Sequence, residues 1–219
     1  MSQSTVPVLP LDIIENIIDI LINDDANGLQ YVTAFSLVCQ SFLPFCRKHI
    51  FSSIHIKLDD SYTHPLTGNP YSEAFGRLLL KTPAIAKYVR HLNICIIRQD
   101  IIRRSYAGSG YLFGQVPRQL TRLQSLTIWH SHYPHNDWNN NSSSMQRSLL
   151  NLMHLPTLSH LNLRWISNFP ISELITCTNL KHLSVEEFHI TGEDEQAASL
   201  LLHKPIQLQS FHILYINRA

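Results

Sequence analysis

The stretch Leu158-Ser-His-Leu161-Asn-Leu163 carries the pattern that decides the fold of most of this chain. An apolar residue is followed three positions later by a second one, and two positions after that by a third. Side chains two apart in a strand point to the same face, so each copy predicts a short strand with one buried face. The pattern occurs six times, with its central apolar residue at positions 54, 92, 126, 161, 183 and 211.

These copies predict a repeating architecture. Leu120 and Leu155 stand three residues before two of the copies and Cys177 takes that place before a third, which extends the pattern to L-x-x-L-x-x-L-x-L. That pattern is the core of a leucine-rich repeat. Helical patterns lie between the copies, at residues 75–80, 149–153 and 197–202. We therefore expect an α/β fold in which a parallel sheet lines one side of a short, irregular right-handed solenoid.

The repeats predict a domain of residues 55–219. Their central positions are 38, 34, 35, 22 and 28 residues apart, so the longer units must carry loops. The chain ends six residues after the last copy, and no capping segment is visible there. Because a solenoid needs a cap over its terminal core, we expect an array that is short or incomplete at its C-terminal end.

The first fifty residues have a helical period instead. Pro10 is suited to open a helix, because the first turn does not need its missing N–H. A second helix is expected over residues 29–39 and a third over 42–51. One side of the second helix would carry Leu29, Val32, Phe35 (or Ala34) and Val38 or Cys39. Two interpretations remain, a helical cap on the larger domain and a docking module whose remaining apolar face meets another protein. The apolar face of the first helix comprises Ile13, Ile14, Ile17, Ile18 and Leu21.

Residues 6–54 resemble an F-box. The resemblance rests on the Leu-Pro pair that opens the Ile-rich stretch 9–21, on Phe-Ser-Leu-Val-Cys at 35–39, and on the aromatic Phe42 three residues later. The family most often has Trp at the place of Phe42. The residues of the motif are similar to those of F-box proteins abundant in mushroom-forming fungi. In those proteins, degenerate leucine-rich repeats follow the F-box.

The resemblance implies binding to a Skp1-type adaptor and, through it, to a cullin–RING ubiquitin ligase. By position in the motif it places Leu9, Pro10, Ile13, Ile14 and Ile17 at the adaptor contact. Leu37, Val38 and Phe42 either complete that contact or hold the helices together. The expected function is that of a non-catalytic substrate receptor of an SCF-type ligase, whose repeats bind an unknown protein. The alternative is a leucine-rich-repeat scaffold with an F-box-like cap and no ligase role.

Composition excludes several other classes of protein. Lys and Arg number 17 against 16 Asp and Glu, so the net charge of +1 does not favour nucleic-acid binding. No apolar run approaches the roughly 20 residues of a membrane span, and the N-terminus has no signal-peptide pattern. The four cysteines lack metal-site spacing. We expect reduced thiols and a location in the cytoplasm, the nucleus or both.

No motif for catalysis or for a cofactor is present. His130, His132, His135 and Asp137 gather potential zinc ligands, but the polar residues after them favour a solvent-exposed loop at 130–144. The glycines at 108–114 lack the Gly-Lys-Ser/Thr ending of a phosphate-binding loop. We therefore expect no enzyme activity, no metal and no cofactor.

Charge is unevenly distributed along the chain. Residues 81–122 contain eight Lys or Arg and one acid, whereas residues 186–195 contain five acids. Ordinary solvated loops would account for this, and so would a basic surface on the repeats that attracts an acidic substrate.

Overall fold

The structure is a computed structural model that describes residues 10–23, 27–59, 70–97, 118–131, 137–141, 143–190 and 208–218. The chain divides into two compact units, Met1–Ser53 and Ile54–Ala219. We call them the helical unit and the sheet unit and describe each by itself. The division falls one residue before the predicted domain boundary. No helix in the described ranges has the length and hydrophobicity needed to cross a membrane.

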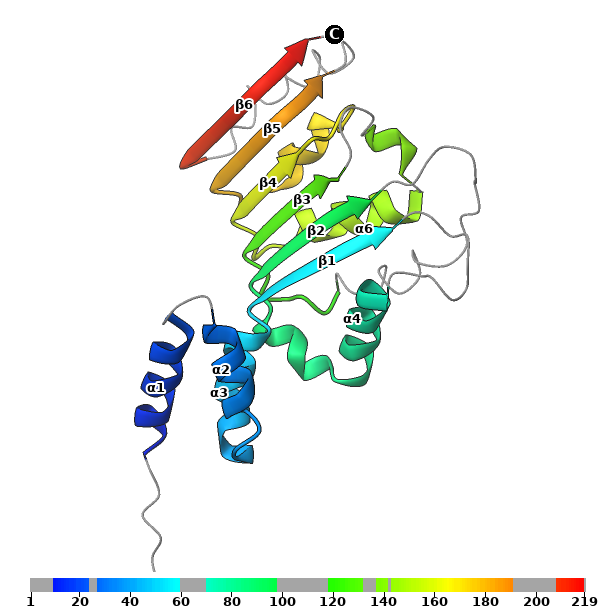
Figure 1. Ribbon diagram of the computed structural model, residues 1–219. Helices are drawn as coiled ribbons and strands as arrows, with labels where there is room; N and C mark the ends of the chain where they lie inside the picture. The colour runs from blue at the N-terminus through cyan, green and yellow to red at the C-terminus, as the bar shows by residue number, and fades with distance from the viewer. Residues whose placement is uncertain are drawn as a thin grey trace, which may run out of the picture. The chain divides into compact units, whose positions relative to one another are not determined.

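The sheet unit contains a six-stranded sheet whose strands are neighbours in chain order (Figure 1). The register is parallel for every pair from the second strand to the sixth. The predicted α/β class with a parallel sheet is therefore confirmed. The strands are β1 (Ser53–Asp59), β2 (His91–Ile97), β3 (Ser125–His130), β4 (His160–Arg164), β5 (His182–Ile190) and β6 (Ser210–Arg218).

The central residues of the sequence pattern align across the sheet. Leu92 pairs with Leu126, Leu126 with Leu161, Leu161 with Leu183, and Leu183 with Phe211. The four leucines are buried. A slip of one residue in any pair would turn a whole apolar set toward solvent, so the shared pattern keeps all these strands in register. Phe211 is exposed, on the last strand of the sheet.

The starts of β3, β4, β5 and β6 repeat one hydrogen-bond arrangement. The carbonyl oxygen two residues before a central position accepts two backbone N–H groups from the start of the next strand, at 2.7 to 3.1 Å. The same local backbone arrangement therefore recurs at four of the sequence copies. The accepting carbonyls belong to Arg90, Gln124, Ser159 and Lys181.

A second repeated contact lies just before β2, β3, β4 and β5. The carbonyls of Leu120, Leu155 and Cys177, the leading residues of the sequence pattern, each accept the N–H three residues later, at 3.0 to 3.2 Å. The carbonyl of Ala86 makes the same bond to Val89, at 3.3 Å. Ala86 is buried and therefore holds the leading position before β2, which its small side chain hid from the sequence pattern.

Helical segments lie between the strands and cover one side of the sheet (Figure 1). Leu79, Leu149, Leu152 and Leu174 on these segments are buried. The predicted helical stretches 75–80 and 149–153 fall inside two of them, and the stretch 197–202 lies outside the described residues. The segments are α4 (Pro70–Lys81), η2 (Pro83–Tyr88), η3 (Trp138–Asn140), α6 (Ser143–Met153) and η4 (Ile171–Thr176).

The predicted exposed loop at 130–144 is wrong for the described part of that range. His130 ends β3 and is buried. Trp138 is buried too, and its ring meets Phe169 edge-on with centroids 4.8 Å apart. Burial of a large aromatic side chain outweighs the polar character of its neighbours, so η3 and the start of α6 form where a loop was expected.

The helical unit contains α1 (Leu11–Asn23), α2 (Gly28–Phe35), η1 (Gln40–Phe42) and α3 (Leu43–Ile50). Its buried core is formed by Ile14, Ile18, Val32 and Cys46. The three predicted helices are present, and Pro44 lies in the first turn of α3, where its missing N–H is tolerated. A Cβ on Gly28 would lie 2.5 Å from the carbonyl oxygen of Ile22, so the close approach of α2 to the end of α1 requires glycine.

The second helix is shorter than predicted. It ends at Phe35 and is followed by a turn over residues 36–38. The Ser36 hydroxyl donates to the Thr33 carbonyl at 2.6 Å, and the Leu37 and Val38 N–H groups bond three residues back. Such local bonds compete with the helical ladder, so the last turn tightens and the helix stops.

Candidate functional site

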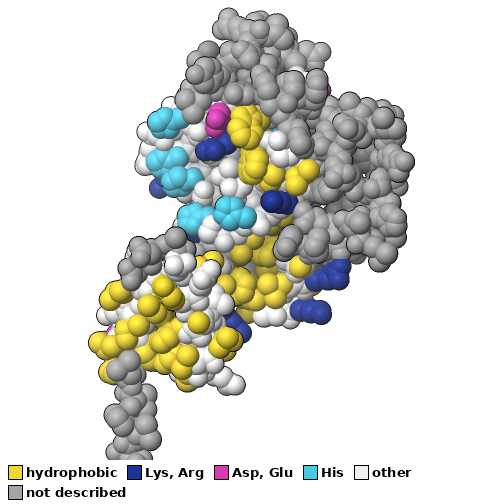
Figure 2. All heavy atoms as spheres, viewed as in Figure 1, with side chains coloured by type: hydrophobic (Ala, Val, Ile, Leu, Met, Phe, Trp, Pro, Cys, Tyr) yellow, Lys and Arg dark blue, Asp and Glu magenta, His cyan; other side chains and the backbone are white. Residues whose placement is uncertain are grey.

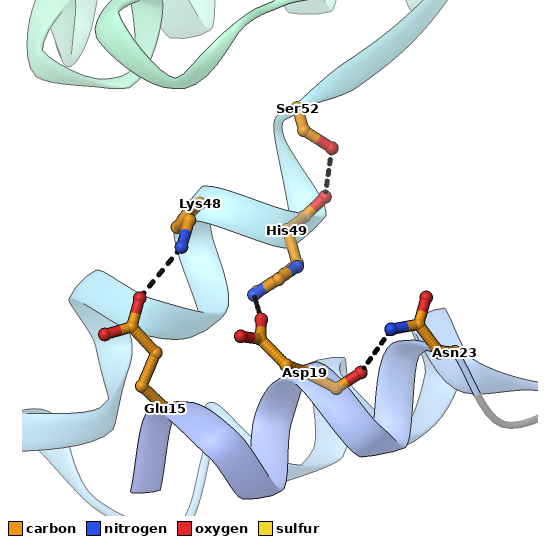
Figure 3. Close-up of polar contacts among 6 residues, drawn as sticks. All are labelled: Glu15, Asp19, Asn23, Lys48, His49 and Ser52. Atoms are coloured by element: carbon orange, nitrogen blue, oxygen red, sulfur yellow. Dashed lines mark hydrogen bonds and ion pairs between the residues drawn. The ribbon is translucent and has the colours of Figure 1, made fainter. Parts of the chain in front are cut away.

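Polar contacts join one side of α1 to α3 (Figure 3). Lys48 Nζ donates to Glu15 Oε1 at 2.8 Å, and His49 Nε2 lies 3.0 Å from Asp19 Oδ1. The hydrogen bond to Glu15 raises the pKa of Lys48. Because the Glu15 and Lys48 side chains are largely solvent-accessible, their ion pair contributes little more than about 1 kcal/mol. These contacts orient α1 rather than stabilise the unit.

A second stripe of α1 is apolar and faces solvent. The side chains of Ile13, Ile17 and Ile20 are 41%, 36% and 67% exposed. Their spacings of four and three residues place them on one face of the helix. Ile14 and Ile18, next to them in sequence, are buried in the core.

The turn after α2 adds the two most exposed of the large apolar side chains in the described part of the chain. Leu37 is 85% exposed and Val38 is 70% exposed. Burying a side chain of this size is worth about 1.5 to 3 kcal/mol. Leaving both in water therefore forgoes free energy that a partner surface would recover.

We call the exposed apolar side chains of the helical unit the apolar surface. Figure 2 shows hydrophobic side chains gathered over this unit. Ten large apolar side chains are exposed in the described residues, and eight of them belong to the helical unit. The other two are Leu80 and Phe211. A concentration of this kind marks an interaction surface. The apolar surface comprises Leu11, Ile13, Ile17, Ile20, Leu29, Tyr31, Leu37 and Val38.

The structure sorts the predicted adaptor-contact residues into two groups. Pro10, Ile13, Ile17, Leu37 and Val38 are exposed. Ile14, by contrast, is part of the core.

Phe42 belongs with Ile14, because it is half-buried and stacks on Phe35 with centroids 4.7 Å apart and planes at 7°. Both residues therefore hold helices together. Leu9 lies outside the described residues.

Four members of the apolar surface were not among the predicted contact residues. Ile20 extends the spacing of Ile13 and Ile17 by three residues, and that period was the signal for it. Leu29 was expected on the same side of the second helix as Val32, but the structure exposes Leu29 and buries Val32, because the short α2 buries only Gly28 and Val32. Leu11 and Tyr31 carried no distinguishing signal in the sequence.

The described residues include potential metal ligands and all four cysteines. They contain no group of three or more potential ligands placed to hold a metal ion. His132 and His135 of the predicted cluster lie outside the described residues. All four cysteines are free, and burial raises the pKa of Cys177 to about 11.

Cys39 differs from the other cysteines and provides a local probe. It is exposed beside the turn at 36–38, with Sγ 3.0 Å from the Ser41 hydroxyl. Hydrogen bonds from the Ser41 side chain and backbone lower the pKa of Cys39. Because the thiolate is the nucleophile, iodoacetamide at neutral pH should alkylate Cys39 roughly tenfold or more faster than Cys46, Cys95 or Cys177.

Peptide mass mapping after brief alkylation measures this difference. Ser41→Ala is expected to slow alkylation of Cys39, whereas Ser143→Ala, a control in α6, is not. Equal alkylation of Cys39 and Cys177 in the folded protein would contradict the prediction.

Comparison of the chain with protein-family models, with curated proteins and with solved structures finds no match.

Proposed function

We propose that this protein is the substrate-receptor subunit of an SCF-type cullin–RING ubiquitin ligase. In this proposal residues 6–54 are an F-box that binds a Skp1-type adaptor through the apolar surface. The sheet unit is a short leucine-rich-repeat solenoid that holds a substrate protein. The observation that carries the proposal is the concentration of exposed apolar side chains on the helical unit.

The division of the predicted adaptor-contact residues into exposed and core side chains supports this proposal. An isolated three-helix cap would have no use for Leu37 and Val38 in water, since both stand on a turn away from its core. A docking module needs such side chains as anchors in a partner's pockets. The polar contacts between α1 and α3 keep Ile13 and Ile17 on the outer side of the helix.

The repeated contacts of the sheet unit support the second half of the proposal. Equivalent turn and strand-start hydrogen bonds recur before β2, β3, β4 and β5. Units that each contact only their neighbours build extended surfaces suited to binding proteins. The receptor would act by raising the concentration of its substrate near the ubiquitin-charged enzyme. The chemistry belongs to its partners, in the cytoplasm or the nucleus.

Capture of a Skp1-type adaptor tests the proposal. Co-expressed adaptor should co-purify with the full chain. The double variant Leu37→Ser/Val38→Ser should weaken adaptor binding about 100-fold, because two buried anchors are lost. Leu80→Ser replaces an equally apolar, exposed residue of the sheet unit and should bind as the wild type does. Calorimetry measures the affinities, and circular dichroism verifies the fold.

Alkylation of Cys39 gives an independent readout of the same complex. Adaptor bound over the turn at 36–38 should slow the reaction of Cys39 with iodoacetamide. If the folded wild-type chain captures no adaptor, the ligase role fails and the scaffold interpretation replaces it. Equal binding by the Leu37→Ser/Val38→Ser variant would place the adaptor elsewhere.

A further inference from the structure

The face of the sheet opposite the helices carries a row of polar side chains at the start of the strands. His91, Ser125, His160, His182 and Ser210 are partners of one another in successive strands. The next residues along β2 to β5 are the buried leucines Leu92, Leu126, Leu161 and Leu183. Because successive side chains of a strand point to opposite faces, the polar row faces away from the core. Figure 2 shows histidine side chains gathered on the sheet unit.

Two of these histidines form an ordered pair. The rings of His160 and His182 stack with centroids 4.2 Å apart and planes at 20°. His160 Nδ1 lies 2.8 Å from the Ser159 hydroxyl, and His182 Nδ1 lies 2.7 Å from that of Ser210. The serines fix the orientation of both rings through Nδ1, which leaves Nε2 of each ring as the position for a ligand.

The pair lies in a groove of ≈ 210 Å³. This volume is below the roughly 300 Å³ of the smallest pockets for organic ligands, so it suits a single side chain. Three histidines and no carboxylate occur among the described residues that line it. The lining residues are Ser125, Thr127, His160, Leu161, Asn162, His182, Leu183, Ser184, Ser210 and His212.

The charges around the pair have one sign. Burial, together with the positive charges of His182, His91 and Lys181, lowers the pKa of His160. The adjoining strand β3 presents only Ser125 and Thr127 to the groove, and β6 presents Ser210 and His212. A bound anion would relieve the repulsion that protonation creates here.

We propose that this groove binds a carboxylate side chain from an acidic peptide segment of a partner protein. Ser, Thr and Asn side chains and the Nε2 positions supply donors for its oxygens, and protonated imidazoles supply the opposite charge. Identifying that partner as a ubiquitination substrate rests on the proposed function, whereas the binding itself does not. A nucleic acid fits less well, because the chain has a net charge of +1 and Glu186, ion-paired to Arg164 at 3.2 Å, lies on the same face.

The proposal predicts binding that strengthens as the pH falls. The carboxylate favours the protonated form of the imidazoles that it contacts. Binding therefore takes up protons, and affinity rises as the pH falls through the range where histidine titrates. At still lower pH the peptide carboxylates become protonated, and binding is lost again.

The test uses the full chain and a fluorescein-labelled peptide with four consecutive glutamates between Gly-Ser ends. Fluorescence anisotropy at constant ionic strength should show about tenfold tighter binding at about pH 6 than at about pH 8. A peptide with glutamine in place of glutamate should bind at least about tenfold more weakly. The variant H160Q/H182Q should lose the pH dependence. The control H154Q changes a histidine outside the groove and should keep it.

Several results would overturn the proposal. Equal binding of the glutamine peptide would do so, and so would unchanged binding by folded H160Q/H182Q. If that variant does not fold, H212Q removes an exposed lining histidine of β6, and unchanged binding by it decides against the groove. Tighter binding of a single-stranded oligonucleotide would assign the surface to nucleic acid instead.

The chain's own acidic residues at 193–195 are the remaining competing occupant. If the peptide binds only after E193Q/D194N/E195Q, that segment occupies the groove and the partner peptide is excluded. The two proposals fail separately. Peptide binding without adaptor capture leaves this inference standing and ends the ligase role, whereas adaptor capture without peptide binding does the reverse.

Discussion

Replacing Ile18 with alanine should lower the free energy of unfolding of the helical unit by about 3 kcal/mol. Ile18 is 0% exposed and packs with Ile14, Val32 and Cys46 in the unit's small core. The deleted atoms lose their burial and leave a cavity that short helices cannot fill. Because so short a unit has little stability in reserve, most of its helical signal should disappear at moderate urea. Far-UV circular dichroism during urea titration measures the loss.

Ile17→Ala is the matched control for this prediction. It is the same substitution, one residue earlier in the same helix, at a side chain that is 36% exposed. It should cost less than about 1 kcal/mol of stability and yet weaken adaptor capture, because Ile17 belongs to the apolar surface. If Ile17→Ala and Ile18→Ala destabilise the unit equally, the assignment of these two isoleucines to surface and core is wrong.

Leu161→Ala should destabilise the sheet unit by a similar amount, about 3 kcal/mol. Leu161 is buried and is paired on both sides, with Leu126 of β3 and Leu183 of β5. The cavity therefore lies in the middle of the sheet, where both neighbouring strands are held in register and cannot close over it. Urea unfolding followed by intrinsic Trp fluorescence measures the change.

Asn162→Ala provides the comparison on the open face of the same strand. The Asn162 side chain points away from the core and accepts one long hydrogen bond, from Arg164 Nε at 3.3 Å. Its removal should cost less than about 1 kcal/mol. A loss as large as that for Leu161→Ala would mean that the alternation of buried and open residues along β4 is not as described.

These pairs of variants test a distinction that the sequence could only partly make. The apolar period placed Ile13, Ile14, Ile17 and Ile18 on one broad face of α1. The structure divides that face, because α2 and α3 cover only part of it. The position of those helices depends on contacts such as Lys48 with Glu15 and the stacking of Phe35 on Phe42. Residues 33 and 7 positions apart make these contacts, and no local pattern reports them.

The open face of the sheet gives a second case. Histidine precedes the central leucine in three of the six copies, at positions 91, 160 and 182, but the sequence offered no reason to connect them. Only the shared register brings His160 and His182, 22 positions apart, to a ring distance of 4.2 Å. The groove and the positively charged groups around the histidine pair follow from that register.

The sequence by itself determined where the strands and most helices lie and that the strands are in one parallel sheet. The repeated pattern was sufficient because the alternation of a strand and the period of a helix are local properties. The tertiary structure alone decided which apolar side chains remain in water, that Ala86 and Trp138 belong to the core, and which polar side chains meet on the open face. Each of these depends on packing between segments distant in the chain, where burial outweighs local preference.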